Sequence, residues 1–357
     1  MEMITVIAYA ALALTIAAVW LSIAAIGMRV INSRHEARVD HVRSHMLQVL
    51  KKFLDGKVGQ EDAAREMRKN RKIAIDMLIG VATELPTAER ERLHVFFRTL
   101  EFDEREHAVL NSRNWLRRAR AASELGLAGH RDSVPELLLA LDDPTLDVRL
   151  AAAHSLAQIK APEAVVPILH ALTLHPHWPV QRAAEILYEM GPCAIAPLIA
   201  FLDDHKYAEP PVLVAVRALG MLEAADGAAL AVELLRHPDD ELRRTAACAL
   251  GQMGDAAIAR TPLIEALSDP VWEVRCMAAQ ALGRLGDRAA VHPLAHALGD
   301  AAWWVRFNAA EALYQLGETG IQAMRQARAQ QPEGLVRDIC SEVLEEHGLP
   351  LAMESAR

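Results

Sequence analysis

The sequence predicts an all-α protein in which one array of short helical repeats occupies most of the chain. The first observation is a recurring segment, clearest at Thr261 to Gly286, TPLIEALSDPVWEVRCMAAQALGRLG. The second is the spacing of its Val-Arg step, because the arginine position returns every 31 or 32 residues. The third is composition: 52% of the residues are hydrophobic and only 4% are aromatic. A fixed period of this length is typical of a solenoid, and an Ala- and Leu-rich chain favours helices over a β-sandwich. The arginine position is occupied in turn by Arg118, Arg149, Gln181, Val212, Arg243, Arg275, Arg306 and Arg337.

Each repeat is predicted to contain two short amphipathic helices joined by a tight turn. Pro262 stands where we expect a first helix to start, because its missing N–H costs least there. Asp269-Pro270 suits the turn, because proline restricts the residue before it. Gly283 and Gly286 are expected to end the second helix. Neither helix can bury its apolar face alone, so stacked neighbours are expected to share one core. The second helix of this copy carries an apolar stripe at helical spacing, made by Val274, Ala278, Ala279 and Leu282.

The same pattern places the other first helices. They are expected at Ser133–Ala140, Ala164–Leu172, Ile195–Leu202, Ala228–Leu235, Thr261–Leu267, Val291–Leu298 and Gly320–Ala329.

The pattern resembles the short HEAT-like repeats, about thirty residues long, of phycobilin lyases and many bacterial adaptor proteins. The resemblance covers residues 114–348 and implies an α-solenoid of about eight repeats. It also implies that the Arg and an Asp six residues before the arginine position join adjacent repeats to one another. Such pairs would fix the register of the repeats. This Asp recurs as Asp143, Asp269 and Asp300. The fold hosts many unrelated functions, so the resemblance does not name a partner.

The amino terminus is predicted to be an uncleaved transmembrane anchor within residues 1–30. No charged residue occurs from Ile4 to Met28, and a helix of this length spans about 37 Å, enough to cross a hydrocarbon core. A signal peptide typically has positive charge before its apolar run, whereas here the only charged residue before the apolar run is Glu2. Positive charge follows the run instead. The positive-inside rule therefore predicts a single-pass inner-membrane protein with its amino terminus outside and its solenoid in the cytoplasm.

Residues 31–113 do not fit the repeat and are expected to form a cytoplasmic helical neck that caps the first repeat. Residues 349–357 are expected to form a short carboxyl-terminal tail. The neck contains a dense basic cluster that could contact anionic lipid, with an ordinary solvated helix face as the alternative. The cluster is Arg68, Lys69, Arg71 and Lys72. Neck helices are predicted at His41–Leu54, at Glu61–Leu85, from Thr87 onward and at Glu104–Asn111.

Charge divides unevenly along the chain. Residues 1–115 contain 17 Lys and Arg against 15 Asp and Glu, while residues 116–357 contain 21 against 32, a net charge of −11. A solenoid this acidic argues against nucleic acid as its partner, because nucleic-acid binding needs a basic stripe.

The repeat pattern is irregular in the middle of the array. Gln181 and Val212 replace the arginine, and Asp203 to Pro211 replaces the short turn. Two interpretations stay open: a bend or docking point carried on an irregular loop, with His205 and Tyr207 as candidate partner-binding residues, or drift without function.

Four tryptophans stand three residues before the arginine position. Because Trp115, Trp178, Trp272 and Trp303 share this register, we expect a structural task, namely covering the turn and the neighbouring helix. Trp304 and Phe307 are additional to the register and are the best candidates for an interface anchor, because tryptophan is enriched among residues that dominate binding.

No residue pattern supports catalysis, a metal or a cofactor. The four cysteines, Cys193, Cys248, Cys276 and Cys340, lack CxxC spacing and are expected to be buried thiols in a reducing compartment. The pairs His41/His45 and His292/His296 lie four residues apart, but metal binding needs further ligands that converge in space. The sequence has no nucleophile elbow, phosphate-binding glycine loop or HExxH motif.

The sequence therefore predicts a non-enzymatic, membrane-anchored scaffold or adaptor. Its concave face, lined by the second helices, is expected to bind a protein, for example within an envelope enzyme complex. Two alternatives remain: a lyase-type enzyme that uses the concave groove, and a regulatory sensor whose solenoid flexes when a ligand binds.

Overall fold

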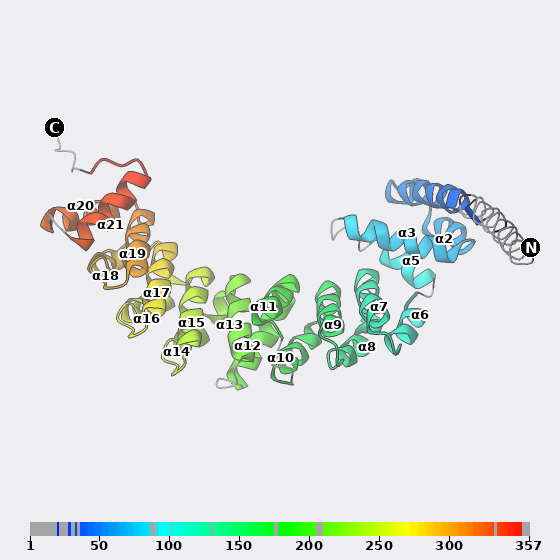
Figure 1. The fold of residues 1–357 in the computed structure, drawn as a ribbon, viewed down its shortest axis with the longest axis horizontal. Coiled ribbons are helices and arrows are strands. Elements are labelled where there is room, and N and C mark those ends of the chain that lie inside the picture. Colours follow the sequence, from blue (N-terminus) through cyan, green and yellow to red (C-terminus); the bar gives the residue numbers. More distant parts are fainter. Residues whose placement is uncertain are drawn as a thin grey trace, which may run out of the picture. The chain divides into compact units, whose positions relative to one another are not determined.

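The computed structural model describes residues 36–85, 90, 92–100, 102–129, 131–174, 178–204, 210–331 and 334–351, together with Trp20, Met28, Arg29 and Ser33. Within these residues all regular structure is helical, as the sequence predicts (Figure 1). The chain forms two compact units: residues 1–108 with 127–130, and residues 109–126 with 131–357.

The first unit is a small helical body with an aromatic core. Residues 36–54 are helical, and four labelled helices follow, α2 (Gln60–Arg68), α3 (Arg71–Glu84), α5 (His94–Thr99) and α6 (Phe102–Leu110). Phe96, Phe97 and Phe102 are fully buried. Phe53 meets Phe96 edge-on with ring centroids 4.8 Å apart, an arrangement that aromatic pairs prefer.

The prediction of one continuous helix over Glu61–Leu85 is wrong. The chain breaks between α2 and α3, where Asn70 takes a non-helical conformation with φ −135° and ψ 55°. Each half has its own buried set: Ala63, Ala64 and Met67 in α2, and Ala74, Ile75, Met77, Leu78 and Ala82 in α3. The two helices contact one another across this turn. Leu85 ends α3 in extended conformation just before Pro86, as expected.

No helix in the described part of the chain is both long and apolar enough to cross a membrane alone. One pair, Val180–Glu189 with Gly191–Asp204, meets the requirement jointly but is bent by 116°. The predicted anchor over Ile4–Met28 lies outside the described residues apart from Trp20 and Met28.

The second unit is the repeat array. Its second helices are α7 (Trp115–Ala128), α9 (Leu146–Ile159), α11 (Val180–Glu189), α13 (Pro211–Met221), α15 (Asp240–Met253), α17 (Trp272–Leu285), α19 (Trp303–Gln315) and α21 (Leu335–Glu346). Its first helices are α8 (Val134–Ala140), α10 (Val165–Leu174), α12 (Ile195–Asp204), α14 (Ala228–Leu234), α16 (Ala256–Ala266), α18 (Val291–Ala297) and α20 (Glu318–Gln330). Short 3-10 turns precede several first helices, at Arg131–Ser133, Pro162–Ala164, Gly191–Ala194, Ala225–Gly227 and Arg288–Ala290.

The helices form two parallel rows (Figure 1). Each second helix packs on the second helix of the next repeat, most extensively for α15, α17 and α19, and the first helices form their own row. The row of second helices lies on the inner side of this unit's curve. Apolar positions at helical spacing, such as Val274, Ala278 and Leu282, are fully buried between the rows. This arrangement confirms the predicted solenoid.

Small residues let neighbouring second helices approach closely. A Cβ on Gly283 would lie 2.8 Å from the Cα of Ala312, and one on Gly251 would lie 2.7 Å from the Cα of Ala281. Gly283 is therefore a buried contact point inside α17, and the prediction that it ends the helix is wrong. Gly286 does end α17, because it caps the helix with φ +69°.

One first helix starts earlier than expected. Asp255 caps α16 by accepting hydrogen bonds from the N–H groups of Ala257 and Ile258, so the helix begins at Ala256 rather than near Thr261. Pro262 consequently lies inside α16, and its predicted place at the helix start is wrong. The other first helices begin within two residues of the predicted positions.

The middle of the array replaces an ion pair with apolar packing. Val212 is fully buried where other repeats have arginine. Arg217 of α13 donates to Gln181 Oε1 on α11 and lies 3.8 Å from Glu241 on α15, so a different polar link joins these repeats.

Candidate interaction face

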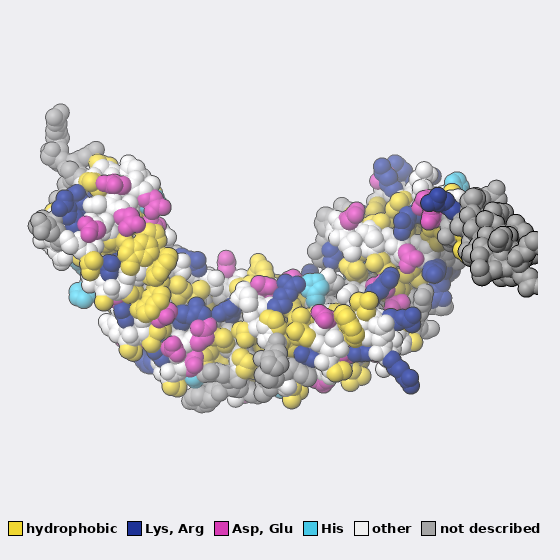
Figure 2. Space-filling view, in the orientation of Figure 1, with side chains coloured by type: hydrophobic (Ala, Val, Ile, Leu, Met, Phe, Trp, Pro, Cys, Tyr) yellow, Lys and Arg dark blue, Asp and Glu magenta, His cyan; other side chains and the backbone are white. Residues whose placement is uncertain are grey.

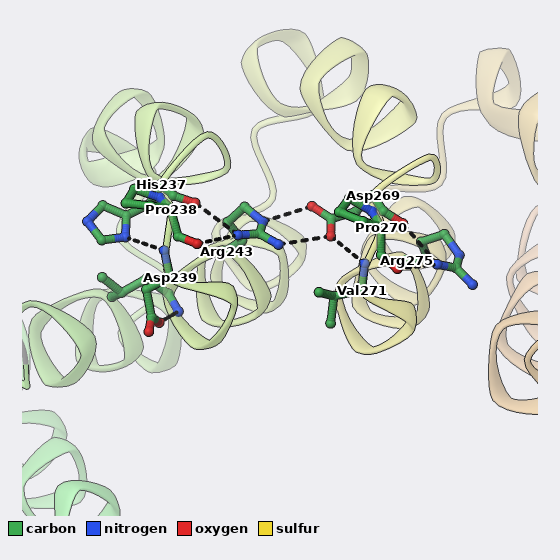
Figure 3. A network of polar contacts seen from close by, with 9 residues as sticks. His237, Pro238, Asp239, Arg243, Asp269, Pro270, Val271 and Arg275 are labelled. Atoms are coloured by element: carbon green, nitrogen blue, oxygen red, sulfur yellow. Dashed lines mark hydrogen bonds and ion pairs between the residues drawn. The ribbon is translucent and has the colours of Figure 1, made fainter.

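A ladder of ion pairs joins neighbouring repeats and accounts for the recurring arginine (Figure 3). Arg243 donates from Nε and Nη2 to both carboxylate oxygens of Asp269 in the next repeat, at 2.8 and 3.1 Å. Its Nη1 donates to the carbonyls of His237 and Pro238 in its own turn. Arg118 with Asp143 and Arg275 with Asp300 repeat this arrangement.

These pairs are largely buried, with side-chain exposures of 9–16%. Each carboxylate also accepts a backbone N–H two residues ahead, for example Val271 N–H on Asp269 at 2.9 Å. The predicted tie between Asp and Arg of adjacent repeats is confirmed. Because the ladder is committed to joining repeats, its residues are not available to a partner.

Burial tends to raise the pKa of Asp143, Asp269 and Asp300, but the arginine and backbone hydrogen bonds outweigh it, so the pKa of each carboxyl is lowered. A carboxyl with a lowered folded-state pKa contributes stability that is present above the unfolded value, about 3.9, and is lost as pH falls through the folded pKa.

We expect the contribution of these three aspartates to the free energy of unfolding to stay constant from neutral pH down to about pH 5. In more acid solution this contribution should fall. Urea unfolding followed by circular dichroism at several pH values measures this. The Asp269→Asn variant should lose less stability than the wild-type chain over the same acid range. Parallel pH curves for the two proteins would contradict the assignment.

Arg149 and Arg306 differ from the three paired arginines of the ladder, because neither has an ion pair with a carboxylate among the described residues. Arg149 and Arg306 are 5% and 6% exposed, and the Nε of each has no hydrogen-bond partner among the described residues. The guanidinium of Arg149 lies over Trp178, 6.0 Å from the ring centroid, and Trp178 is itself buried. Trp178 thus performs the covering task that we predicted for all four register tryptophans. Trp115, Trp272 and Trp303 are more exposed, at 39–45% of their surface, and for them the covering role stays a prediction.

Three aromatic side chains gather at the start of α19. Trp303 stacks on Phe307, with ring centroids 5.0 Å apart and planes at 17°, and Trp304 stands edge-on to Trp303 at 4.7 Å and 79°. Trp304 is 53% exposed, and Phe307 is half-buried. The sequence-predicted anchors Trp304 and Phe307 are therefore brought together, with their rings 6.3 Å apart.

A polar groove of about 290 Å³ adjoins this aromatic cluster and shares Phe307 with it. The groove runs over α17, α19 and the end of α21. Its polar lining residues are Gln280, Asn308, Glu311, Gln315, Glu346 and His347. His347 pairs with Glu311 at 2.9 Å and stacks on Tyr314 at 3.7 Å, so the imidazole has a fixed position at the groove edge.

Figure 2 shows how this part of the array differs from its surroundings. Hydrophobic side chains gather over α17 and α19 toward the left end of the view, and acidic side chains lie beside them over α19 and α21. We call Trp303, Trp304, Phe307, Glu311, Glu346 and His347 together the aromatic–acidic face.

Sequence reasoning missed the polar half of this face, although the repeat period contains the signal. Adding 31 to Gln280 gives Glu311, and adding 31 to Gln315 gives Glu346, so the groove is lined by equivalent positions of successive second helices. The other predicted partner-binding residues, His205 and Tyr207, lie outside the described residues.

The remaining candidates offer little chemistry. No group of three or more His, Cys, Asp or Glu side chains that could hold a metal occurs in the described ranges. All four cysteines are free thiols; burial raises the pKa of Cys340 to about 12 and also raises the pKa of Cys276. Neither thiol is prepared to act as a nucleophile, since the thiolate is the reactive form.

Comparison with known proteins agrees with this architecture. The family model of HEAT repeats matches residues 104–189 and 260–345, and that of the PBS lyase HEAT-like repeat matches residues 242–269. The array is a HEAT-repeat solenoid. No curated protein sequence matches the chain.

Solved structures similar to the HEAT-repeat solenoid include Kap121p, with a TM-score of 0.54, 13% identity, and coverage of 83% of this chain and 41% of that one. The CpcE–CpcF complex of phycocyanin lyase from Nostoc sp. PCC7120 has a TM-score of 0.33 and 22% identity, covering 68% and 94%. Human deoxyhypusine hydroxylase in complex with glycerol has a TM-score of 0.28 and 24% identity, covering 86% and 97%. At these identities the Kap121p likeness shows the fold alone, and the other two superpositions are too loose to support an argument about function.

Proposed function

We propose that this protein is a non-enzymatic scaffold or adaptor that binds a protein partner through the inner row of its HEAT-repeat solenoid. The observation that carries the proposal is the aromatic cluster on α19. Burial of Trp304 is not needed for the solenoid, because this side chain is 53% exposed in the folded repeat. Exposed tryptophans beside a groove are typical anchors of protein interfaces, in which a few such residues supply most of the binding energy.

We further propose that residues 1–30 anchor the protein in the inner membrane, as its apolar run and the following basic residues indicate. The basic cluster Arg68, Lys69, Arg71 and Lys72 is exposed at the turn between α2 and α3. Within the cluster, Lys69 forms an ion pair with Glu66 at 2.5 Å. We propose that the cluster also contacts anionic lipid at the membrane surface.

A topology reporter tests the membrane proposal. With the amino terminus outside, a fusion after Arg357 should be active only with a reporter that works in the cytoplasm. The same chain fused to a reporter that requires export should be inactive. The reverse result would place the solenoid on the other side and overturn the proposed location.

Trp304→Ala tests the anchor. We expect the melting temperature of the full chain to stay unchanged and recovery of the partner from detergent-solubilised native membrane to fall at least tenfold, since anchoring side chains contribute about 2 kcal/mol or more. Trp115→Ala is the matched control, because Trp115 is 45% exposed at the start of the second helix of the first repeat, a position equivalent to that of Trp303. Loss of stability with unchanged partner recovery would assign Trp304 to packing and contradict the proposal.

A further inference from the structure

We infer that the aromatic–acidic face binds a basic segment of the partner, with a Lys or Arg side chain over the aromatic cluster and paired with Glu311 and Glu346. This inference rests on the proposed function and specifies the chemistry of the partner. It is argued from three properties of the face: exposed aromatic rings, carboxylates next to them, and a surplus of acidic charge around both.

The aromatic cluster presents ring surface to a cation. Stacking with Phe307 occupies one side of Trp303, but the cluster stays open to solvent, because Trp303 is 39% and Trp304 53% exposed. Cations are attracted to the faces of tryptophan and phenylalanine rings within about 6 Å of the centroid, and arginine is the commonest partner.

The carboxylates adjoin the aromatic rings. Phe307 lines the groove together with Glu311 and Glu346, so a side chain that enters the groove along Phe307 has both acids beside it. Glu311 uses Oε1 to pair with His347, and its Oε2 has no partner in the described part of the chain. Gln280 and Gln315 line the same groove and can hydrogen-bond the backbone of a bound segment.

The charge of the helices around the aromatic–acidic face also favours a basic segment. Helices α19 and α21 carry two basic residues against five acidic ones. Arg306, one of the two basic residues, is buried and donates to the carbonyls of Asp300 and Ala301. The acidic residues are Glu311, Asp338, Glu342, Glu345 and Glu346. Residues 116–357 carry a net charge of −11, so the field of the array also steers a basic segment toward it. An acidic partner or an anionic lipid would be repelled.

Three fluorescein-labelled twelve-residue peptides with identical leucine and alanine positions test the inference, one with four Arg, one with four Gln and one with four Glu. Binding to the full chain in non-ionic detergent is followed by anisotropy at low and high salt. We expect the Arg peptide to bind at least about tenfold more tightly than the Gln peptide, and this difference to shrink with salt.

Variants locate the binding. Glu311→Gln with Glu346→Gln should weaken the Arg peptide about fivefold to tenfold and leave the Gln peptide unchanged, since each exposed charge pair contributes up to about one factor of five. Glu265→Gln is the matched control, because Glu265 is 62% exposed in an ion pair on α16, in the other row. Glu265→Gln should bind all peptides as the wild-type chain does.

Equal binding of the Arg and Gln peptides, or Arg-peptide binding that ignores the loss of both glutamates, would overturn the inference. Self-association of the chain that Trp304→Ala abolishes, with no peptide preference, would assign the face to a second copy and also overturn it. The proposed function is tested separately. The scaffold proposal still holds if recovery of the membrane partner depends on Trp304. The scaffold proposal is wrong, and the inference about a basic segment stands, if the chain prefers the Arg peptide but no partner is recovered through Trp304.

Discussion

Replacing Arg275 by alanine is expected to lower the free energy of unfolding of the array by about 3 kcal/mol or more. The side chains of Arg275 and Asp300 are 16% and 12% exposed and are joined by two hydrogen bonds of 2.7 and 2.8 Å. Removing one member of a buried pair leaves the other charge without compensation, which costs more than the pair itself contributes. Arg275 also donates to the carbonyl of Asp269, so the turn of its own repeat loses a bond.

Chemical denaturation of the full chain, together with hydrogen exchange across α17 and α19, measures this effect. Arg236→Ala is the matched control, because Arg236 and Glu265 form a pair that is 79% and 62% exposed, and its loss should cost less than about 1 kcal/mol. In a double-mutant cycle, Asp300→Asn should add little once Arg275 is gone. Equal effects of Arg275→Ala and Arg236→Ala would show that the ladder does not hold the repeats together.

Replacing Gly283 by alanine is the second large effect, and its sign is opposite to the usual one. In a helix interior this change normally stabilises by about 0.5–1 kcal/mol, because glycine loses more backbone freedom on folding. Here the new Cβ would lie 2.8 Å from both the Cα and the Cβ of Ala312, so α17 and α19 must separate. We expect destabilisation of about 1–3 kcal/mol, and more for Gly283→Leu.

Gly80→Ala is the matched control for Gly283→Ala. Gly80 lies in the interior of α3, and nothing lies within 4 Å of the position its Cβ would take. This variant should be as stable as the wild-type chain or more so. Thermal unfolding of both variants, with protection of the α17 and α19 amides as a local readout, compares them. Stabilisation by Gly283→Ala would show that the two helices are not in close contact.

The repeat pattern predicted the array well because its information is local and periodic. The arginine position, the Asp of the turn and the apolar stripe each recur at the same spacing, and the structure places each of them as that spacing requires. The pattern did not predict helix boundaries that depend on a single residue. Asn70 breaks a run of residues that otherwise suits one helix, and Asp255 starts α16 before the proline.

The candidate site was predicted in part for a related reason. Trp304 and Phe307 stood out because they are additional to the repeat register, and an irregularity is visible in sequence. Glu346 was missed although it stands one period of 31 residues after Gln315, whereas the contact of His347 with Glu311 depends on α21 packing beside α19. The stacking of Trp303 on Phe307 was not predicted, because its register suggested the covering role in which Trp178 lies beside the buried guanidinium of Arg149.

The direction of the ion-pair ladder has a consequence for how such a chain can lengthen. Every complete pair joins an arginine on one second helix to an aspartate in the turn that follows, 25 or 26 residues later. A gene segment that encodes one period, such as the stretch containing Asp269 and Arg275, therefore carries one donor and one acceptor. A tandem duplication of that segment would supply both halves of the new junction at once, with no further mutation. Duplication of the period around Val212 would insert a junction without a pair, so a period that carries both residues is the better unit for lengthening the array.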